Sequence, residues 1–261
     1  MIACYIRGAG IAAPGLPGFP AARDTLRGVA PYVFAAETAY APELLPPNER
    51  RRATASVRQA FRAAEDAVKG SGRDASALAS VFASSDADMA VLHRICAALA
   101  QEPRVISPTD FHNSVHNAAS GYWSIAVHSM ALTTTLSAYD ASFAIGLIEA
   151  AALVAAHRDV LLVAYDAVAP QPLLGKRPLA MSAGVALILS ADAGGAAFGR
   201  IDVSLEAAAE TACAVAALEP LRVANPALRA LPLFELLAGR RAGIVNLRGT
   251  GEMCAQVSFT P

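Results

Sequence analysis

The side chains best suited to nucleophilic chemistry in this chain are its cysteines, and their surroundings do not indicate catalysis. They lie far apart, without the paired spacing of a metal site or a disulfide framework. Thr211-Ala-Cys213-Ala begins like a nucleophilic-cysteine signature, but no Ser-Gly follows it and no histidine occurs after His157 to activate a thiol. We expect an Ala-rich helix over residues 207–218. We also expect reduced, buried, small hydrophobic side chains at all four positions, Cys4, Cys96, Cys213 and Cys254.

Two histidines have the spacing of metal ligands on a helix, since His112 and His116 are four residues apart. The amides and the hydroxyl beside them, at Asn113, Ser114 and Asn117, are poor additional ligands. We therefore favour a turn or a subunit interface here and predict no metal. Gly8-Ala-Gly10 and Gly249-Thr-Gly251 are too short for a dinucleotide or phosphate-loop fingerprint, so no cofactor is predicted either.

The most informative segment joins a Thr-rich strand at Thr133 to an apolar helix over residues 141–156 and a second strand over 160–165. A helix N-terminus placed after such a turn stabilises a thiolate or an oxyanion. This chain has Ala138-Tyr139-Asp140 at the turn. A tyrosine hydroxyl, with a pKa near ~10, is a poor nucleophile unless its surroundings shift it strongly. The segment predicts a catalytic scaffold without its nucleophile.

Composition excludes several classes of function. The chain has 261 residues, 16% of them charged, and a net charge of −1, so we expect neither nucleic-acid nor polybasic membrane binding. Its hydrophobic content of 55% exceeds the usual ~45–50% and favours an oligomer. The apolar stretch over 141–156 carries Glu149 and is shorter than the ~20 residues of a membrane span. With no signal peptide visible, we expect a soluble cytoplasmic protein.

Strands alternate with helices along the chain, which indicates an α/β fold with a mixed, buried sheet. After a first strand over 2–6 we expect a Gly- and Pro-rich loop. Asn48 is the expected N-cap of a helix that runs to Val68 and carries the apolar stripe Ala53, Val57, Ala60, Phe61 and Ala64. A further helix is expected from Ala118.

Together these pieces resemble the N-terminal half of a β-ketoacyl synthase, a condensing enzyme of the thiolase fold. The resemblance rests on residues 6–11, 117–125, 133–156, 159–164 and 182–190. It implies a thiolase-like α/β fold, with a mixed five-stranded sheet and a buried central helix. It also implies two parts: residues 1–205 as the N-terminal-like domain and residues 206–261 as a shortened remnant of the second half.

The family nucleophile is a cysteine at the turn that opens the buried helix. Ungapped alignment to Asp159-Val160 puts it at Tyr139, and a one-residue slip puts it at Ala138. Neither residue can form the acyl thioester. The two catalytic histidines of the family's second half have no counterpart, because His157 is the last histidine.

A synthase-like chain without these groups resembles a chain-length factor, the non-catalytic partner of a ketosynthase in polyketide, aryl-polyene or fatty-acid-type elongation. The resemblance implies a heterodimer with a catalytic ketosynthase, transient contact with an acyl carrier protein, and no condensation by this chain alone. It suggests that Tyr139 shapes the site and that Phe111, Trp123 and Phe143 limit tunnel depth, with ordinary core packing as the alternative. The full set expected at the tunnel or partner interface is Phe111, His112, Asn113, His116, Asn117, Trp123, Tyr139, Asp140, Ser142 and Phe143.

Two other functions stay open. One is a stand-alone acyltransferase or thioesterase-like enzyme that uses Cys213, Cys254 or the Tyr139–Asp140 pair. The other is a docking module for an acyl carrier protein.

Overall fold

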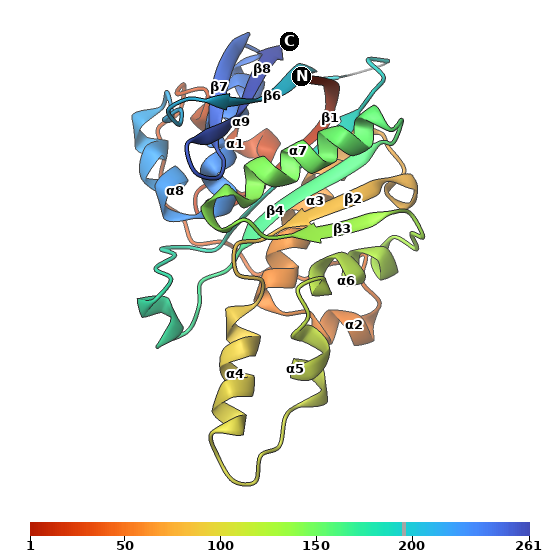
Figure 1. Cartoon of the computed structure of the whole chain (residues 1–261), viewed down its shortest axis with the longest axis vertical. Helices are drawn as coiled ribbons and strands as arrows, with labels where there is room; N and C mark the ends of the chain where they lie inside the picture. Colours follow the sequence, from red (N-terminus) through yellow and green to blue (C-terminus); the bar gives the residue numbers. More distant parts are fainter. Residues whose placement is uncertain (195–196) are drawn as a thin grey trace.

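Successive side chains on the buried strands point to opposite faces of one sheet and so build two separate hydrophobic cores. Val81 and Leu162 belong to one core, whereas their neighbours Phe82 and Leu161 belong to the other. The computed structural model, which describes residues 1–194 and 197–261, thus has helices packed on both faces of the sheet (Figure 1).

The sheet has eight strands in the described part of the chain, in the order β3-β2-β4-β5-β1-β6-β8-β7. β2 runs parallel to β3 and β4, and every other pairing is antiparallel. The strands are β1 (Ile2–Ala12), β2 (Ala79–Ala83), β3 (Thr133–Leu136), β4 (Val160–Asp166), β5 (Ala183–Ser190), β6 (Gly199–Ala207), β7 (Gly243–Arg248) and β8 (Met253–Thr260).

One face of the sheet is covered by α7 together with α1 and α9, and the other by α3 and α6. The helices are α1 (Phe19–Leu26), α2 (Pro47–Arg52), α3 (Ala55–Ser71), α4 (Met89–Leu99), α5 (Pro108–Asn113), α6 (Ala118–Ala126), α7 (Ser142–Ala155), α8 (Glu219–Ala224) and α9 (Leu231–Gly239). The apolar stripe expected on the helix after Asn48 is buried at each of its five positions.

The first strand is longer than predicted, because the pair of glycines expected to lie in a loop belongs to it. Gly8 and Gly10 pair with β5 and lie directly under α3. A Cβ atom at Gly10 would lie 2.1 Å from the main-chain oxygen of Ala63. These glycines therefore allow α3 to approach the sheet closely.

Two predicted helices are wrong. The helix expected from Asn48 to Val68 is two helices, α2 and α3, because Thr54 caps α3 by accepting a hydrogen bond from the Val57 N–H (3.3 Å). The stretch 207–218, expected to be an α-helix, begins as the end of β6, continues as irregular chain and ends in the single 3-10 turn Ala216–Leu218. Its amides are bound by side chains instead: Glu235 accepts from the N–H groups of Ala214 and Val215 at 2.8 Å.

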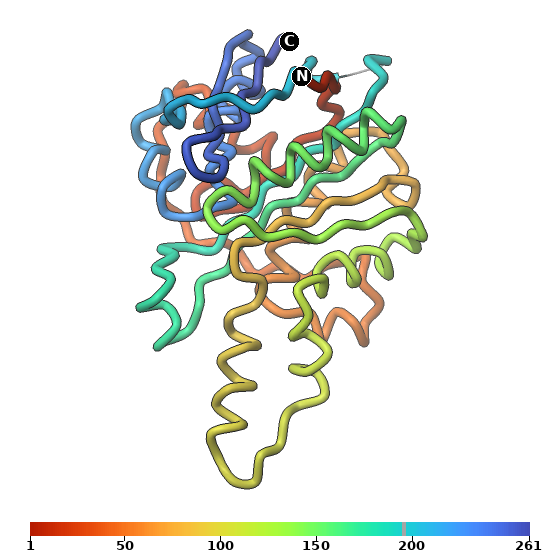
Figure 2. Tube along the Cα trace, viewed as in Figure 1, coloured from red at the N-terminus to blue at the C-terminus, as the bar shows by residue number. Residues whose placement is uncertain are grey.

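Helices α4 and α5 form an arm that leaves the body of the protein after β2 and returns before α6 (Figure 2). Within α4, Val91 is the buried side chain, and within α5 it is Asn113. Arg94 on α4 pairs with Asp110 on α5 at 2.6 Å and links the two helices. The arm thus leaves most of its apolar side chains partly or fully exposed. Cys96 on α4, which was expected to be buried, is exposed because α4 packs little against the body of the protein.

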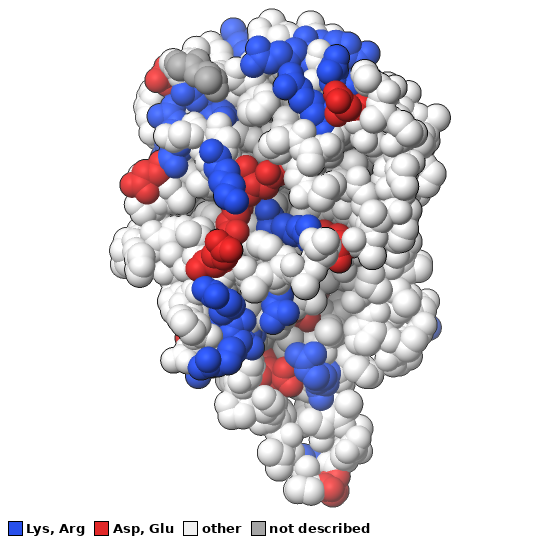
Figure 3. All heavy atoms as spheres, turned by 180° about the vertical axis from the view of Figure 1, so that it is seen from behind, with Lys and Arg blue, Asp and Glu red and all other residues white. Residues whose placement is uncertain are grey.

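The fold confirms the predicted thiolase-like α/β architecture with a mixed sheet and a helix, α7, packed against its centre. Strands β1 to β5 make up a five-stranded part, and β6, β8 and β7 widen the same sheet beyond the predicted five. No helix of the described residues combines the length and apolar character needed to cross a bilayer. On the face opposite that of Figure 1, charges of both signs lie close together along the molecule (Figure 3).

Candidate functional site

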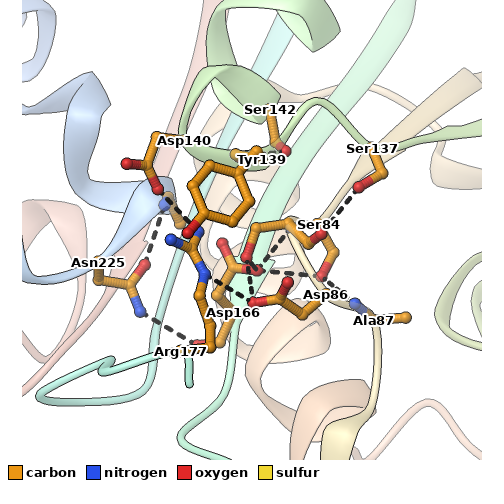
Figure 4. A network of polar contacts seen from close by, with 12 residues as sticks. Ser84, Asp86, Ala87, Ser137, Tyr139, Asp140, Ser142, Asp166, Arg177 and Asn225 are labelled. Atoms are coloured by element: carbon orange, nitrogen blue, oxygen red, sulfur yellow. Dashed lines mark hydrogen bonds and ion pairs between the residues drawn. The ribbon is translucent and has the colours of Figure 1, made fainter. Parts of the chain in front are cut away.

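The ends of three parallel strands bring polar side chains to one edge of the sheet. Ser84 follows β2, Ser137 follows β3, and Asp166 is the last residue of β4. Because β2, β3 and β4 are parallel, their carboxyl ends meet at the same edge, where ligands of open α/β sheets bind. The Ser137 hydroxyl donates to the Ser85 carbonyl oxygen at 2.8 Å. The α7 turn lies directly beside this edge (Figure 4).

Asp166 is a fully buried carboxylic acid in this cluster. Its Oδ1 accepts hydrogen bonds from the Ser85 N–H (2.7 Å), the Ser85 hydroxyl (2.8 Å) and the Ser84 hydroxyl (3.1 Å). Its Oδ2 has no hydrogen-bond partner among the described residues. Burial raises its pKa to about 7, against the opposing effect of the hydrogen bonds, so the group is close to half-protonated near neutral pH.

Tyr139 lies at the apex of the turn between β3 and α7. Its φ is +54°, a left-handed conformation that is strained for a bulky side chain. The Ser142 side chain holds the turn, because its hydroxyl donates to the Tyr139 carbonyl oxygen (2.7 Å) and accepts from the Ala138 N–H (3.0 Å). The Tyr139 side chain is 57% exposed and is presented at the surface of this turn.

Arg177, from the segment between β4 and β5, stacks its guanidinium on the Tyr139 ring at 3.6 Å from the centroid (Figure 4). Its Nε donates to Asp86 Oδ2 at 2.9 Å, and its Nη2 donates to Asp140 Oδ1 at 2.7 Å. Asp140 also lies 3.8 Å from Arg229, which in turn pairs with Glu210 at 3.2 Å. Ion pairs therefore connect the turn to the segment over residues 210–229.

Two of the three aromatic side chains expected to limit tunnel depth, Trp123 and Phe143, lie on opposite faces of the sheet. Trp123 is packed edge-to-face on Phe61 at 5.2 Å, in the core under α3 and α6. Phe143 is fully buried in the core under α7. The sheet separates them, so the structure does not bring them together at the turn.

The remaining residues that were expected at the tunnel or partner interface lie on α5 and just after it, in segments separate from the Tyr139 turn. Phe111 is 70% exposed, and His112 and Asn117 are also exposed. Asn113 is buried and donates to the Arg52 carbonyl oxygen at 3.1 Å. α5 ends at Asn113, so His112 and His116 do not share a helix face. No cluster of three or more metal-ligating His, Cys, Asp or Glu side chains occurs within residues 1–194 and 197–261.

Neither of the candidate cysteines has the surroundings of a nucleophile. Burial, and then the charges of Glu235 and Glu219, raise the pKa of the Cys213 thiol well above its usual range. Cys254 is buried in β8 and donates to the Ala208 carbonyl oxygen at 3.1 Å. Both lie outside the strand-end cluster that surrounds Tyr139.

Sequence reasoning identified Tyr139, Asp140 and Ser142 but missed the residues that surround them. Arg177 comes from a segment 37 positions away, and no spacing in the sequence links it to the turn. Asp166 could have been found from the sequence, because it is the charged residue at which the buried strand β4 ends.

Comparison with solved structures gives the same fold. The chain is similar to a chain of the ketosynthase (ApeO) in complex with its chain length factor (ApeC) from Xenorhabdus doucetiae, with 22% identity and a TM-score of 0.74, covering 99% of this chain and 100% of that one. A chain of the type II polyketide synthase complex AntDE:AntF, an acyl-carrier protein with its ketosynthase, matches with 12% identity and a TM-score of 0.76 over 100% and 99% of the two chains. The ishigamide ketosynthase/chain length factor matches with 13% identity and a TM-score of 0.72 over 99% of each chain.

No curated protein sequence matches the chain. The family model for the β-ketoacyl synthase N-terminal domain matches residues 29–225, which is more than half of the sequence. This match includes the strand-end cluster, the Tyr139 turn and α7. The chain belongs to the β-ketoacyl synthase N-terminal domain family.

Proposed function

We propose that the chain is a non-catalytic, chain-length-factor-like subunit that pairs with a catalytic β-ketoacyl synthase in polyketide, aryl-polyene or fatty-acid-type chain elongation. The observation that carries the proposal is Tyr139 at the apex of the strained turn before α7. A sharp strand-to-helix turn of this kind presents a nucleophile in other acyl-transferring folds. Here it presents a phenol ring held by Arg177, which cannot form an acyl thioester.

The polar groups around the turn include no histidine among the described residues, which supports the same proposal. The contacts of the Tyr139 turn described above involve Ser, Asp and Arg side chains. His157, the last histidine in the sequence, follows the C-terminal end of α7, at the opposite end of the helix from the turn. In our proposal the catalytic histidines belong to the partner, and residues 206–261 are a shortened remnant of the second half of the family fold.

The surface around β3 fits a heterodimer interface. β3 is the edge strand of the sheet, and its outer side pairs with no other strand of the described residues. Large apolar side chains lie exposed on and near the segments that flank it: Phe111, Val115, Ile125, Met130 and Leu132. An open edge beside exposed apolar surface is a template for pairing with another chain. We propose that this surface and the arm contact the ketosynthase.

The roles of the individual site residues follow from this proposal. Tyr139, with Asp140 and Ser142 as its supports, forms a wall of the chamber that encloses the partner's growing acyl chain. Phe111, His112 and Asn117 contact the partner from the arm, while Asn113 and His116 support the arm's base. Trp123 and Phe143 act through core packing. Two similar structures are named as ketosynthases with chain length factors, and a third includes an acyl-carrier protein, which supports transient carrier contact here. We also propose a cytoplasmic location.

Co-expression with a catalytic β-ketoacyl synthase tests this proposal. We expect the two chains to co-purify and the Phe111→Asp substitution to abolish co-purification, because it puts a charge on the exposed arm. Phe34→Asp is the matched control, since Phe34 is nearly as exposed (66% against 70%) but lies between α1 and α2. Incubation of the isolated chain with an acyl thioester, followed by intact mass spectrometry, should give no adduct. A stable covalent adduct, or normal co-purification of the Phe111→Asp variant, would contradict the proposal.

A further inference from the structure

Arg177 covers one face of an otherwise exposed tyrosine. The guanidinium carbon lies 3.6 Å from the centroid of the Tyr139 ring, although the Tyr139 side chain is still 57% exposed on the rest of its surface. A guanidinium stacked on an aromatic face at this distance makes a cation–π contact. Arg177 thus restrains the ring of Tyr139 from one of its faces.

Arg177 is itself held tightly. Its side chain is only 11% exposed, and its Nε and Nη2 atoms donate to two different carboxylates, Asp86 at 2.9 Å and Asp140 at 2.7 Å. Asp86 follows β2 and Asp140 belongs to the turn itself, so Arg177 ties the segment after β4 to both. The planar fork of a guanidinium can stack on a ring and bind two carboxylates at once, whereas a lysine ammonium cannot.

From these contacts we infer that Arg177 is the positioning residue for Tyr139, and that it fixes the ring as a rigid wall over the N-terminal turn of α7. This inference rests on the proposed function, in which that wall bounds the partner's reaction chamber. Without Arg177 the ring loses its stacked neighbour and gains side-chain freedom, while the backbone of the turn is still held by Ser142. The wall would then recede or move, and longer acyl chains would fit.

The first test uses the isolated chain and a double-mutant cycle. Arg177→Leu and Tyr139→Leu are made singly and together, and the unfolding equilibrium is measured in urea. Arg177→Leu raises the unfolding equilibrium constant by some factor in each background. We expect this factor to be about fivefold smaller in the Tyr139→Leu background than in the natural one, which equals about 1 kcal/mol of coupling. Arg200→Leu is the control, because it breaks an exposed ion pair with Asp202 far from the turn and should show no coupling to Tyr139. Absence of coupling between Arg177 and Tyr139 would overturn the inference.

The second test measures the product chain-length distribution of the complex with the catalytic ketosynthase. We expect Arg177→Leu and Tyr139→Leu to shift the distribution in the same direction, and the double variant to behave like either single one, because Arg177 acts through Tyr139. Arg177→Lys keeps the charge but not the fork, so it should restore the natural distribution only in part. Additive shifts, or a shift in Tyr139→Leu alone, would overturn the positioning role.

The two tests separate this inference from the proposed function. If the chain binds no ketosynthase, or if Tyr139→Leu leaves the products of the complex unchanged, the proposed chamber role is wrong. The coupling measured in the isolated chain still decides whether Arg177 positions Tyr139. If Arg177→Leu does not fold, Arg177→Lys replaces it in the cycle, with the same coupling expected at a smaller magnitude.

Discussion

Asp166 makes the stability of this protein depend on pH, and replacing it with asparagine should remove its contribution to that dependence. Burial raises the pKa of Asp166 from its ordinary 3.8 to about 7 in the folded chain. Between those two values the unfolded chain has lost the proton while the folded chain keeps it. The free energy of unfolding therefore falls as pH rises from about 4 to about 7, and is constant with respect to this group outside that window.

The magnitude follows from the size of the shift. About three pH units at roughly 1.36 kcal/mol each make the ionised Asp166 side chain destabilising by about 4 kcal/mol at pH 8. An asparagine keeps an oxygen that can accept the hydrogen bonds from Ser84 and Ser85, and it carries no charge. We therefore expect the free energy of unfolding of Asp166→Asn to exceed that of the natural chain by about 4 kcal/mol at pH 8. At pH 4 the two free energies of unfolding should be nearly equal.

Urea unfolding followed through Trp123 measures this difference directly. Trp123 is the single tryptophan and is only 2% exposed, so its fluorescence reports loss of the core. Asp24→Asn is the control, because Asp24 is an exposed carboxylate paired only with Arg27, and its effect should not vary over this range. If the natural chain and Asp166→Asn give parallel pH profiles from 4 to 8, Asp166 is ionised throughout in the folded protein. The reasoning from burial would then be refuted.

Three further outcomes are expected from the packing and from the thiols. Phe143→Ala should lower the free energy of unfolding by about 3–5 kcal/mol in the same urea assay, because Phe143 is fully buried; a loss below 1 kcal/mol would contradict this. Gly10→Ala should destabilise by about 1–3 kcal/mol, since its Cβ would lie 2.1 Å from a main-chain oxygen of α3. Gly70→Ala, in the open part of the same helix, should instead stabilise by about 0.5–1 kcal/mol, and equal effects at the two glycines would be inconsistent with the close approach. With iodoacetamide at pH 8, exposed Cys96 should be alkylated well before Cys213, whose pKa is raised by burial; faster labelling of Cys213, seen by peptide mass spectrometry, would favour the enzyme alternative.

Elements whose pattern is local and strong could be predicted from the sequence. The strand at Thr133, the apolar helix before His157 and the buried strand from Val160 all lie within one or two residues of their predicted positions. The helix and the strand from Val160 have long apolar runs, and the strand at Thr133 is a run of β-branched threonines. The same local evidence predicted a strand–turn–helix unit with Tyr139 at the turn.

Elements that depend on distant partners were mispredicted. The stretch 207–218 contains residues with high helix propensity, but its amides are bound by Glu219 and Glu235 and it pairs through Thr211 with β7. Tertiary contacts of this kind override propensity. β1 extends through Gly8 and Gly10 for a related reason, because α3 packs directly on the backbone of those glycines.

The sequence by itself determined the fold class, the family resemblance and the absence of a cysteine or a nearby histidine at the turn before the apolar helix, because these depend on residue identity and local periodicity. Only the tertiary structure decided what surrounds Tyr139. Arg177 and Asp86 come from segments on either side of the turn in the sequence, and the parallel arrangement of β2 and β4 carries both to the same sheet edge. Trp123 and Phe143 lie in separate cores because α6 and α7 cover opposite faces of the sheet. Contacts between side chains far apart in the chain are set by sheet order and register, which local pattern does not encode.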